Sequence, residues 1–209
     1  MKKLSIFLVM VMILSAGCSK KKQSTTLEGD TDIPLNIVGN IFSSGSFLFP
    51  GNAQILQNNG GDLILKTQIS LPVGNPLTAL IPSSMKDATG NLNTELKFKQ
   101  TSEGILEYSL NSDQAAFVIV RYDAKVGDKY TLRKGDGNTI TRTVTYVSTE
   151  DDYFWSMMLI KVITVEQDSR IPGVARIVYN ANHKFGMVGV LIYMEDGSVV
   201  NLPIYPQNY

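Results

Sequence analysis

The sequence has few of the residues on which many functional sites depend. It contains one cysteine and one histidine among 209 residues. A single cysteine excludes a disulfide framework, and a single histidine leaves a histidine-based metal site short of ligands. Basic and acidic residues number 19 each, which gives no electrostatic footprint for nucleic acid. Stability must therefore come from an apolar core, and we expect no nucleic-acid partner and no cofactor.

Long apolar runs are also missing, except at the start of the chain. Lys2 and Lys3 precede an apolar stretch over residues 4–14, which is followed by small residues. This order of charged, apolar and small residues is typical of a secretory signal. The stretch is too short for a bilayer-crossing helix, which needs about 20 apolar residues. From residue 19 onward, polar residues interrupt every apolar run well before that length.

The small residues lead to the only cysteine. Ser15-Ala16-Gly17-Cys18 resembles the lipobox of bacterial envelope lipoproteins, in the looser version that lacks the usual leucine at the position of Ser15. The resemblance implies removal of residues 1–17 as a signal peptide and attachment of diacylglycerol to Cys18. The alternatives are a retained anchor, which the short apolar stretch disfavours, and an ordinary cleaved signal, which would leave a lone thiol in an oxidising compartment.

Acylation would hold the protein at a membrane, because two or more acyl chains anchor stably. Ser19 replaces the aspartate that in some bacteria retains lipoproteins at the inner membrane, so the resemblance implies the outer membrane. Residues 18–32 are almost free of apolar side chains and are expected to form a flexible tether. Without Lys2 and Lys3 the chain has 17 basic and 19 acidic residues, a net charge near −2. Residues 33–209 fit a single domain.

The pattern of this domain predicts β-strands. Short runs rich in β-branched and aromatic residues, mostly bounded by Gly, Asn and Asp, are typical of strands. Eight such runs are residues 62–70, 94–99, 105–110, 115–122, 128–133, 139–146, 187–194 and 199–205. One or two further strands are expected within the apolar residues 153–165, whose composition favours strand over helix.

Strict alternation is clearest in residues 139–146. Threonines occupy every second position from Thr139, and Ile140, Arg142, Val144 and Tyr146 fall on the opposite face. Such a period of two marks a strand with two unlike faces.

Helix is expected only as one or two short turns within residues 75–86, because Pro82 breaks any longer helix. Pro203 suggests that the last run is an edge strand. In total we expect about ten to twelve strands of the usual length.

The fold class is therefore all-β, with mainly antiparallel strands. Short strings such as Val126-Gly-Asp-Lys-Tyr130 and Val188-Gly-Val190, within residues 115–205, make the chain similar to envelope proteins built on one strongly curved sheet, the shape of periplasmic lipoprotein carriers. That resemblance implies a single curved antiparallel sheet. A β-sandwich or a flattened barrel also fits the pattern.

Few residues suggest chemistry. His183 lies in a polar stretch and is expected to be a structural or exposed side chain rather than a ligand or base. Glu150, Asp151 and Asp152 are considered as a calcium site, but no calcium-binding loop surrounds them, and a solvated turn is favoured. Gly-x-Ser-x-Gly and phosphate-loop motifs are absent. Aromatic residues crowd the last third, and Tyr153, Phe154 and Trp155 are the candidate binding surface, although aromatics commonly pack β cores.

Three functions remain open from the sequence. The first is a lipid-anchored envelope protein with a binding or scaffolding role, without catalysis, which has an envelope protein as partner. The second is a carrier of a hydrophobic ligand or lipid in a concave sheet. The third is an enzyme that acts on envelope glycans. An apolar cavity enclosed by the sheet would favour the second function, and a fully packed interior would exclude it.

Overall fold

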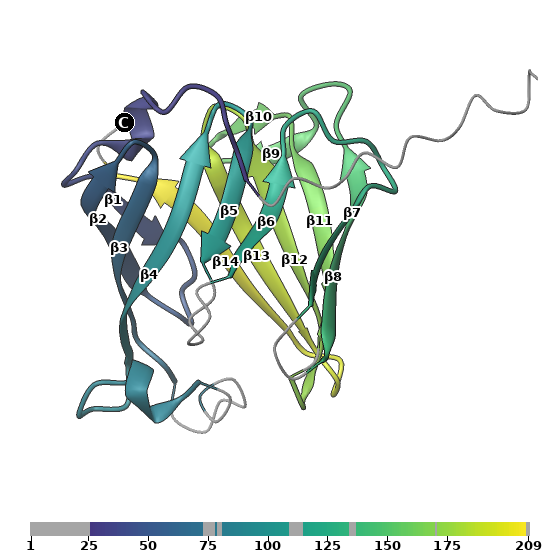
Figure 1. Cartoon of the computed structure of the whole chain (residues 1–209). Coiled ribbons are helices and arrows are strands. Elements are labelled where there is room, and N and C mark those ends of the chain that lie inside the picture. Colours follow the sequence, from purple (N-terminus) through teal and green to yellow (C-terminus); the bar gives the residue numbers. More distant parts are fainter. Residues whose placement is uncertain are drawn as a thin grey trace, which may run out of the picture.

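The structure is a computed structural model that describes residues 26–72, 78, 81–108, 115–133, 137–169 and 171–207. The expected signal peptide, residues 1–17, and Cys18 lie outside the described residues. In the described part, all but two strands join one twelve-stranded antiparallel sheet that curls into a nearly closed, barrel-like shape (Figure 1). The prediction of an all-β chain with one strongly curved antiparallel sheet is confirmed.

Most strands pair with their neighbours along the chain, and β1 pairs with β2 and with the distant β14. Their bounds are β1 (Ile41–Ser44), β2 (Gly51–Asn59), β3 (Asp62–Ile69), β4 (Leu92–Thr101), β5 (Gly104–Tyr108), β6 (Ala116–Arg121), β7 (Lys129–Arg133), β8 (Thr139–Val147), β9 (Tyr153–Trp155), β10 (Met158–Ile160), β11 (Ile163–Asp168), β12 (Val174–Asn182), β13 (Gly186–Met194) and β14 (Val199–Pro206). The order in the large sheet is β6-β5-β4-β3-β2-β1-β14-β13-β12-β11-β8-β7, and β9 pairs only with β10.

The eight strands predicted individually correspond to β3 to β8, β13 and β14. Residues 153–165 contain three strands rather than one or two, because β9 and β10 form a separate hairpin before β11. The strands β1, β2 and β12 were not predicted. Helix is limited, in the described residues, to single 3₁₀ turns at η1 (Pro34–Asn36) and η2 (Ser83–Met85) and to residue 78, and η2 and residue 78 lie within the residues where short turns were expected.

The last strand is central, so the prediction of an edge strand at Pro203 is wrong. β14 pairs with β13 on one side and with β1 on the other. The carbonyl of Pro203 accepts a hydrogen bond from the Gly45 amide, just after β1 ends at Ser44. In a strand, the nitrogen and the carbonyl of one residue point to the same side. The nitrogen of Pro203, which carries no hydrogen, therefore points towards the side of β1, and β1 ends before it reaches this position. A central strand tolerates a proline there because no ladder bond is lost.

The segment before β1 crosses one end of the barrel. Leu27 is buried in the core, and the Glu28 amide donates to the Glu103 carboxylate. The Asp30 amide donates to the Ser102 hydroxyl, and the Ser102 amide donates to the Asp30 carbonyl. Residues 26–32 therefore pack on the turn between β4 and β5, whereas the composition of residues 18–32 predicted a tether. Burial of the isolated Leu27 and these hydrogen bonds explain the difference.

The β9–β10 hairpin lies outside the large sheet. Trp155 is buried, its indole N–H donates to the Ile204 carbonyl of β14, and its ring lies 4.8 Å from that of Phe185. Ser156 and Met157 form the two-residue turn, with φ of 48° and 68°, the backbone of a type I′ hairpin turn. The hairpin thus covers the back of the sheet near β14. Among the described residues, no helix has the length and apolar character to cross a membrane.

Candidate ligand cavity

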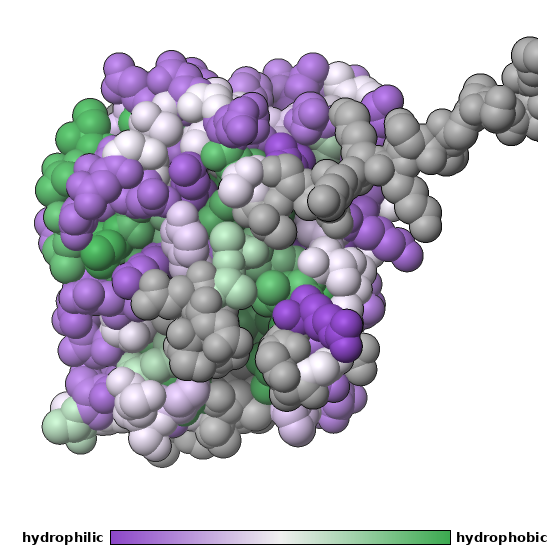
Figure 2. Space-filling view, in the orientation of Figure 1, coloured by the Kyte–Doolittle hydropathy of each residue, from purple (hydrophilic) through white to green (hydrophobic). Residues whose placement is uncertain are grey.

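The curved sheet holds an apolar cavity of about 290 Å³ that is partly open to solvent. Residues of β1 to β6 line one side, and residues from Tyr179 to Ile204 line the other. In Figure 2, apolar side chains lie in a hollow near the middle of the face that carries β5 and β6. The space is therefore inside the curved sheet and not between separate elements.

Alternation along β3 and β4 builds the first wall. Leu63, Leu65, Thr67 and Ile69 of β3 all line the cavity, while the residues between them point to the outer face. Leu65 pairs with Leu96 of β4, so two leucines meet near the middle of the wall. A period-two pattern thus gives a continuous apolar surface on one side of the sheet.

The opposite wall comes from the C-terminal strands. Tyr179 of β12 pairs with Val190 of β13, and Val190 pairs with Leu202 of β14. All three line the cavity, as does Ile204 two residues further along β14. Strands that are far apart in the sequence therefore share one ligand-sized space.

Several polar residues interrupt this apolar lining, namely Ser43, Ser44, Asn52, Thr67, Gln100 and Glu107. Glu107 of β5 lines the cavity with a side chain that is 34% exposed. Thr67 is only 5% exposed, and its hydroxyl has no hydrogen-bond partner among the described residues. A buried hydroxyl without a partner costs free energy, so Thr67 marks a place where a partner is missing.

Arg142 of β8 is buried beside the cavity. Its side chain is 1% exposed, and Nη2 donates to Oε1 of Glu107 over 2.6 Å. Nε donates to Oε1 of Gln167 over 2.8 Å, and Nη1 donates to the carbonyls of Phe117 and Val118 over 3.3 and 3.0 Å. The guanidinium also lies over the Phe117 ring, 3.9 Å from its centroid. A buried charge is tolerated when it is paired and fully hydrogen-bonded.

This arginine also bridges the open seam of the sheet. β6 and β7 are the two outer strands and do not pair with each other. Arg142 of β8 reaches two carbonyls of β6, and the Arg121 amide of β6 donates to the Tyr130 hydroxyl of β7. Side chains thus replace the missing backbone ladder across the seam.

Burial controls the ionisation of the tyrosines near Arg142. The pKa of Tyr179 is raised, mainly by burial, although the charge of Arg142 acts in the opposite direction. Burial also raises the pKa of Tyr130. Both phenols therefore stay neutral at physiological pH and can donate and accept hydrogen bonds in this network.

The three aromatic residues predicted as a binding surface form the strand β9, and their side chains point to its two opposite sides. Tyr153 and Trp155 face the large sheet, where Asn180 donates to the Tyr153 hydroxyl over 3.5 Å. Phe154 points the other way and is 69% exposed. The structure brings Phe154 together with exposed Met157, Met158 and Leu159 on the hairpin. A role of these three aromatics in binding stays a prediction.

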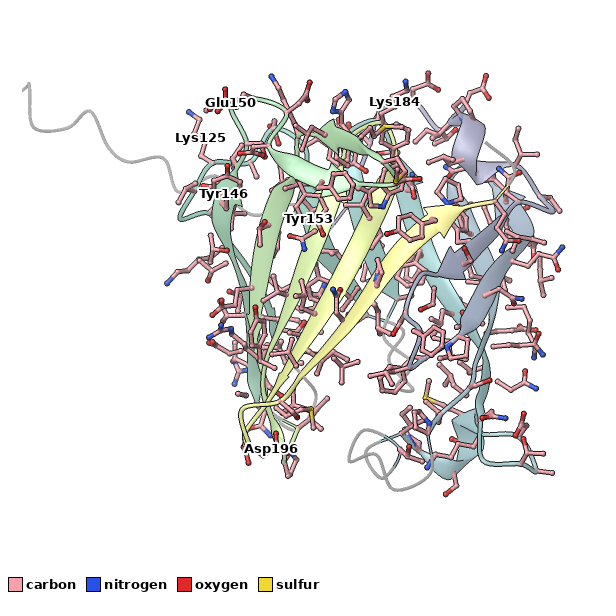
Figure 3. All side chains as sticks on the ribbon, turned by 180° about the vertical axis from the view of Figure 1, so that it is seen from behind. Lys125, Tyr146, Glu150, Tyr153, Lys184 and Asp196 are labelled. Atoms are coloured by element: carbon pink, nitrogen blue, oxygen red, sulfur yellow. The ribbon has the colours of Figure 1, made fainter. Side chains whose placement is uncertain are left out.

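The other candidate residues lie at one end of the barrel. His183 is exposed in the turn between β12 and β13. Glu150 lies at the same end (Figure 3), in the turn after β8, and no cluster of potential metal ligands occurs among the described residues. Asp152 accepts hydrogen bonds from Ser148 and Tyr146, which lower its pKa. These contacts order a surface turn.

Sequence reasoning missed the three polar residues that characterise the cavity. Arg142 was placed on the apolar face of residues 139–146, and a lone charge between Ile140 and Val144 was the available signal. Glu107 and Thr67 gave no comparable signal, because a single polar residue in a short strand is common on exposed faces.

Comparison of this chain with protein-family models, with curated proteins and with solved structures finds no match.

Proposed function

We propose that this protein is a lipid-anchored cell-envelope protein that binds and carries one apolar ligand inside its barrel. The proposal assigns it no catalytic step. The observation that carries it is the apolar cavity of about 290 Å³. The anchor at Cys18 and the place at the outer membrane come from the lipobox resemblance.

The size and lining of the cavity support a ligand. Protein interiors are close-packed, with few voids larger than a water molecule, so an interior space of this size needs a reason. Its volume lies near the lower end of the range for small-molecule sites, about 300–1,000 Å³. Leucine, isoleucine and phenylalanine dominate its walls, and a space lined in this way favours apolar matter over water. One acyl chain or a molecule of similar size fits these limits.

The test is a matched pair of substitutions on neighbouring residues of β4. Leu96 lines the cavity, whereas Lys97 is exposed on the outer face. Leu96→Trp fills the cavity, and Lys97→Trp adds the same ring outside it. Both are placed in the Cys18→Ser chain, which carries no acyl groups and so needs no detergent that would compete for the cavity.

Binding of phenylnaphthylamine, a neutral apolar fluorophore, is the first measurement. We expect at least a tenfold loss of affinity for Leu96→Trp and no change for Lys97→Trp. Mass spectrometry of an organic extract is the second measurement, and it should find a copurifying apolar molecule only in the control. Equal binding by the two variants, or no binding by either, would overturn the proposal.

A second candidate function, contact with an envelope protein, rests on the exposed side of the hairpin. Phe154 and Met157–Leu159 place four large apolar side chains in solvent, and such a patch is typical of an interaction site. Cross-linking in intact cells should then capture a partner with the parent chain and not with Phe154→Ser/Met157→Ser. Capture by both chains would show that the partner binds elsewhere.

A further inference from the structure

We infer that the ligand of the cavity is a single-chain amphiphile whose polar head donates hydrogen bonds, such as a hydroxyl or a protonated amine, and not a free carboxylate or phosphate. This inference rests on the proposed function, because it names the ligand class of the same cavity. It follows from the hydrogen bonds of Arg142 and Glu107, the charged pair at the cavity wall.

The first step concerns Arg142, the cation that pairs with Glu107 at the cavity wall. A guanidinium has five N–H donors. Those of Arg142 are directed at Gln167, at the Phe117 and Val118 carbonyls, at Glu107 and, over 3.4 Å, at the Tyr179 hydroxyl. The Tyr179 hydroxyl in turn donates to Gln167 over 3.3 Å. Arg142 therefore has no donor left for an anionic ligand.

The second step concerns the acceptor that remains. Glu107 lines the cavity, and among the described residues its only partner is Arg142, through Oε1. An ionised carboxylate offers about four acceptor positions and no donor. The free positions of Glu107 can bind an O–H or N–H group, while a second carboxylate or a phosphate would be repelled.

The third step concerns the distance between Glu107 and Thr67 along the cavity wall. Glu107 pairs with Phe98, and Phe98 pairs with Leu63, so Glu107 and Leu63 lie at the same level of the sheet. Thr67 follows Leu63 by four residues on the same face of β3. At about 3.3 Å per residue, Thr67 lies roughly 13 Å further along the strand than Leu63. Thr67 is one of the lining residues, and its buried hydroxyl has no hydrogen-bond partner among the described residues. A chain with a donor head at Glu107 would thus have Thr67 beside it further along its length.

The experiment compares ligands that share one chain and differ in the head. Decanol, decylamine and decanoate are titrated against phenylnaphthylamine bound to the Cys18→Ser chain at pH 7, where decanoate is ionised. A hydrogen bond to a charged group is worth roughly tenfold or more in affinity. We expect decanol and decylamine to displace the fluorophore at concentrations at least tenfold below that of decanoate.

Substitutions separate this preference from the general cost of burying a carboxylate. In Glu107→Gln the preference over decanoate should shrink by about tenfold, whereas Glu95→Gln on the exposed outer face of β4 should leave it unchanged. Because Glu107→Gln removes the partner of a buried arginine, it can fail to fold. Thr67→Val provides the second test, with decane-1,10-diol, whose second hydroxyl lies about one chain length from the first. It should weaken diol binding about fivefold and leave decanol binding unchanged, while Thr67→Ser, which keeps the hydroxyl, should bind the diol like the parent chain.

The outcomes distinguish the two proposals. Decanoate that binds as tightly as decanol, a preference that Glu107→Gln does not change, or diol binding that Thr67→Val does not change would overturn the inference and leave an apolar carrier in place. If the fluorophore itself does not bind, the proposed function fails, and the inference fails with it.

Discussion

The two sides of the barrel interior differ in how they are filled. The filled side, formed by β5 to β8 and β11, holds a cluster of buried residues around Arg142, including Val144 and Val165. The hollow side, formed by β1 to β4 with β13 and β14, leaves most of the cavity. Both sides follow the same alternation of inward and outward residues. The pattern therefore fixes which residues point inward, and the size and charge of those residues decide whether the interior is closed.

The difference has an energetic meaning. Atoms that line an empty space lose the dispersion contacts they would make with neighbours on that side. Residues of the filled side should thus contribute most of the folding stability. Residues of the hollow side should contribute less to stability and should instead contact a ligand. Four comparisons of variants are measured in the Cys18→Ser chain by urea unfolding.

The largest effect is expected for Arg142→Met. The substitution leaves Glu107, Gln167 and two carbonyls of β6 without their donor, and removal of one partner of a buried ion pair costs about 3–5 kcal/mol of unfolding free energy. Arg176→Met is the control, because Arg176 is 45% exposed and its pair with Glu166 lies at the surface. That change should cost less than about 1 kcal/mol. Equal losses would show that the Arg142 network does not stabilise the filled side.

The next effect compares a fully packed leucine with one that lines the cavity. Leu106 belongs to a buried cluster and is 1% exposed, and Leu65 lines the cavity. Leu106→Ala should lower the free energy of unfolding by about 3 kcal/mol. Leu65→Ala should cost about 1 kcal/mol, because its side chain already has an unfilled neighbour. If Leu65→Ala lowered the free energy of unfolding as much as Leu106→Ala, Leu65 would not border an empty space.

A smaller gain is expected for Tyr122→Phe on the filled side. The Tyr122 hydroxyl is buried and has no hydrogen-bond partner among the described residues. Its removal should raise the free energy of unfolding by about 1 kcal/mol. Tyr146→Phe is the control, since that hydroxyl is on an exposed residue and donates to Asp152. A loss of stability in Tyr122→Phe would show that the hydroxyl has a partner after all.

The smallest effect is a change in the pH dependence of stability. Burial, together with the hydrogen bond to Asp62, raises the pKa of Tyr108 to about 12 from an ordinary value of 10. Because the folded-state pKa is the higher one, this contribution is complete below pH 10 and is lost as pH rises towards 12. Tyr108→Phe should therefore flatten the loss of stability between pH 10 and 12. An unchanged slope would show that Tyr108 does not contribute to it.

The sequence was sufficient for the elements with strong alternation. Thr139 to Val147 separates threonines from apolar residues, and the structure places Val144 inside and Thr145 outside. β2 was missed because its Gln and Asn residues occur on both faces, and β12 because Asn180 and Asn182 resemble loop residues. Local patterns report the local environment, and polar residues in these strands are held by long-range hydrogen bonds such as that from Asn58 to the Asn36 carbonyl.

From the sequence, a cavity was only one of several possibilities. A leucine that lines an empty space, such as Leu65, has the same sequence pattern as a leucine in a packed core. The partners of Arg142 come from residues 107, 117, 118, 167 and 179, and no spacing rule joins them. Sheet closure brings them together, and that closure depends on pairings such as β1 with β14, which are about 160 residues apart in the chain.

The central position of β14 in the sheet determines when the barrel can close. Without Val199–Pro206 the sheet order separates into β1 to β6 on one side and β7, β8 and β11 to β13 on the other. A chain that lacks β14 therefore holds two incomplete sheets with bare edges, which are prone to pair with other molecules. The barrel cannot close until β14 has been made, and a deletion of β14 should yield aggregating material rather than a weaker binder.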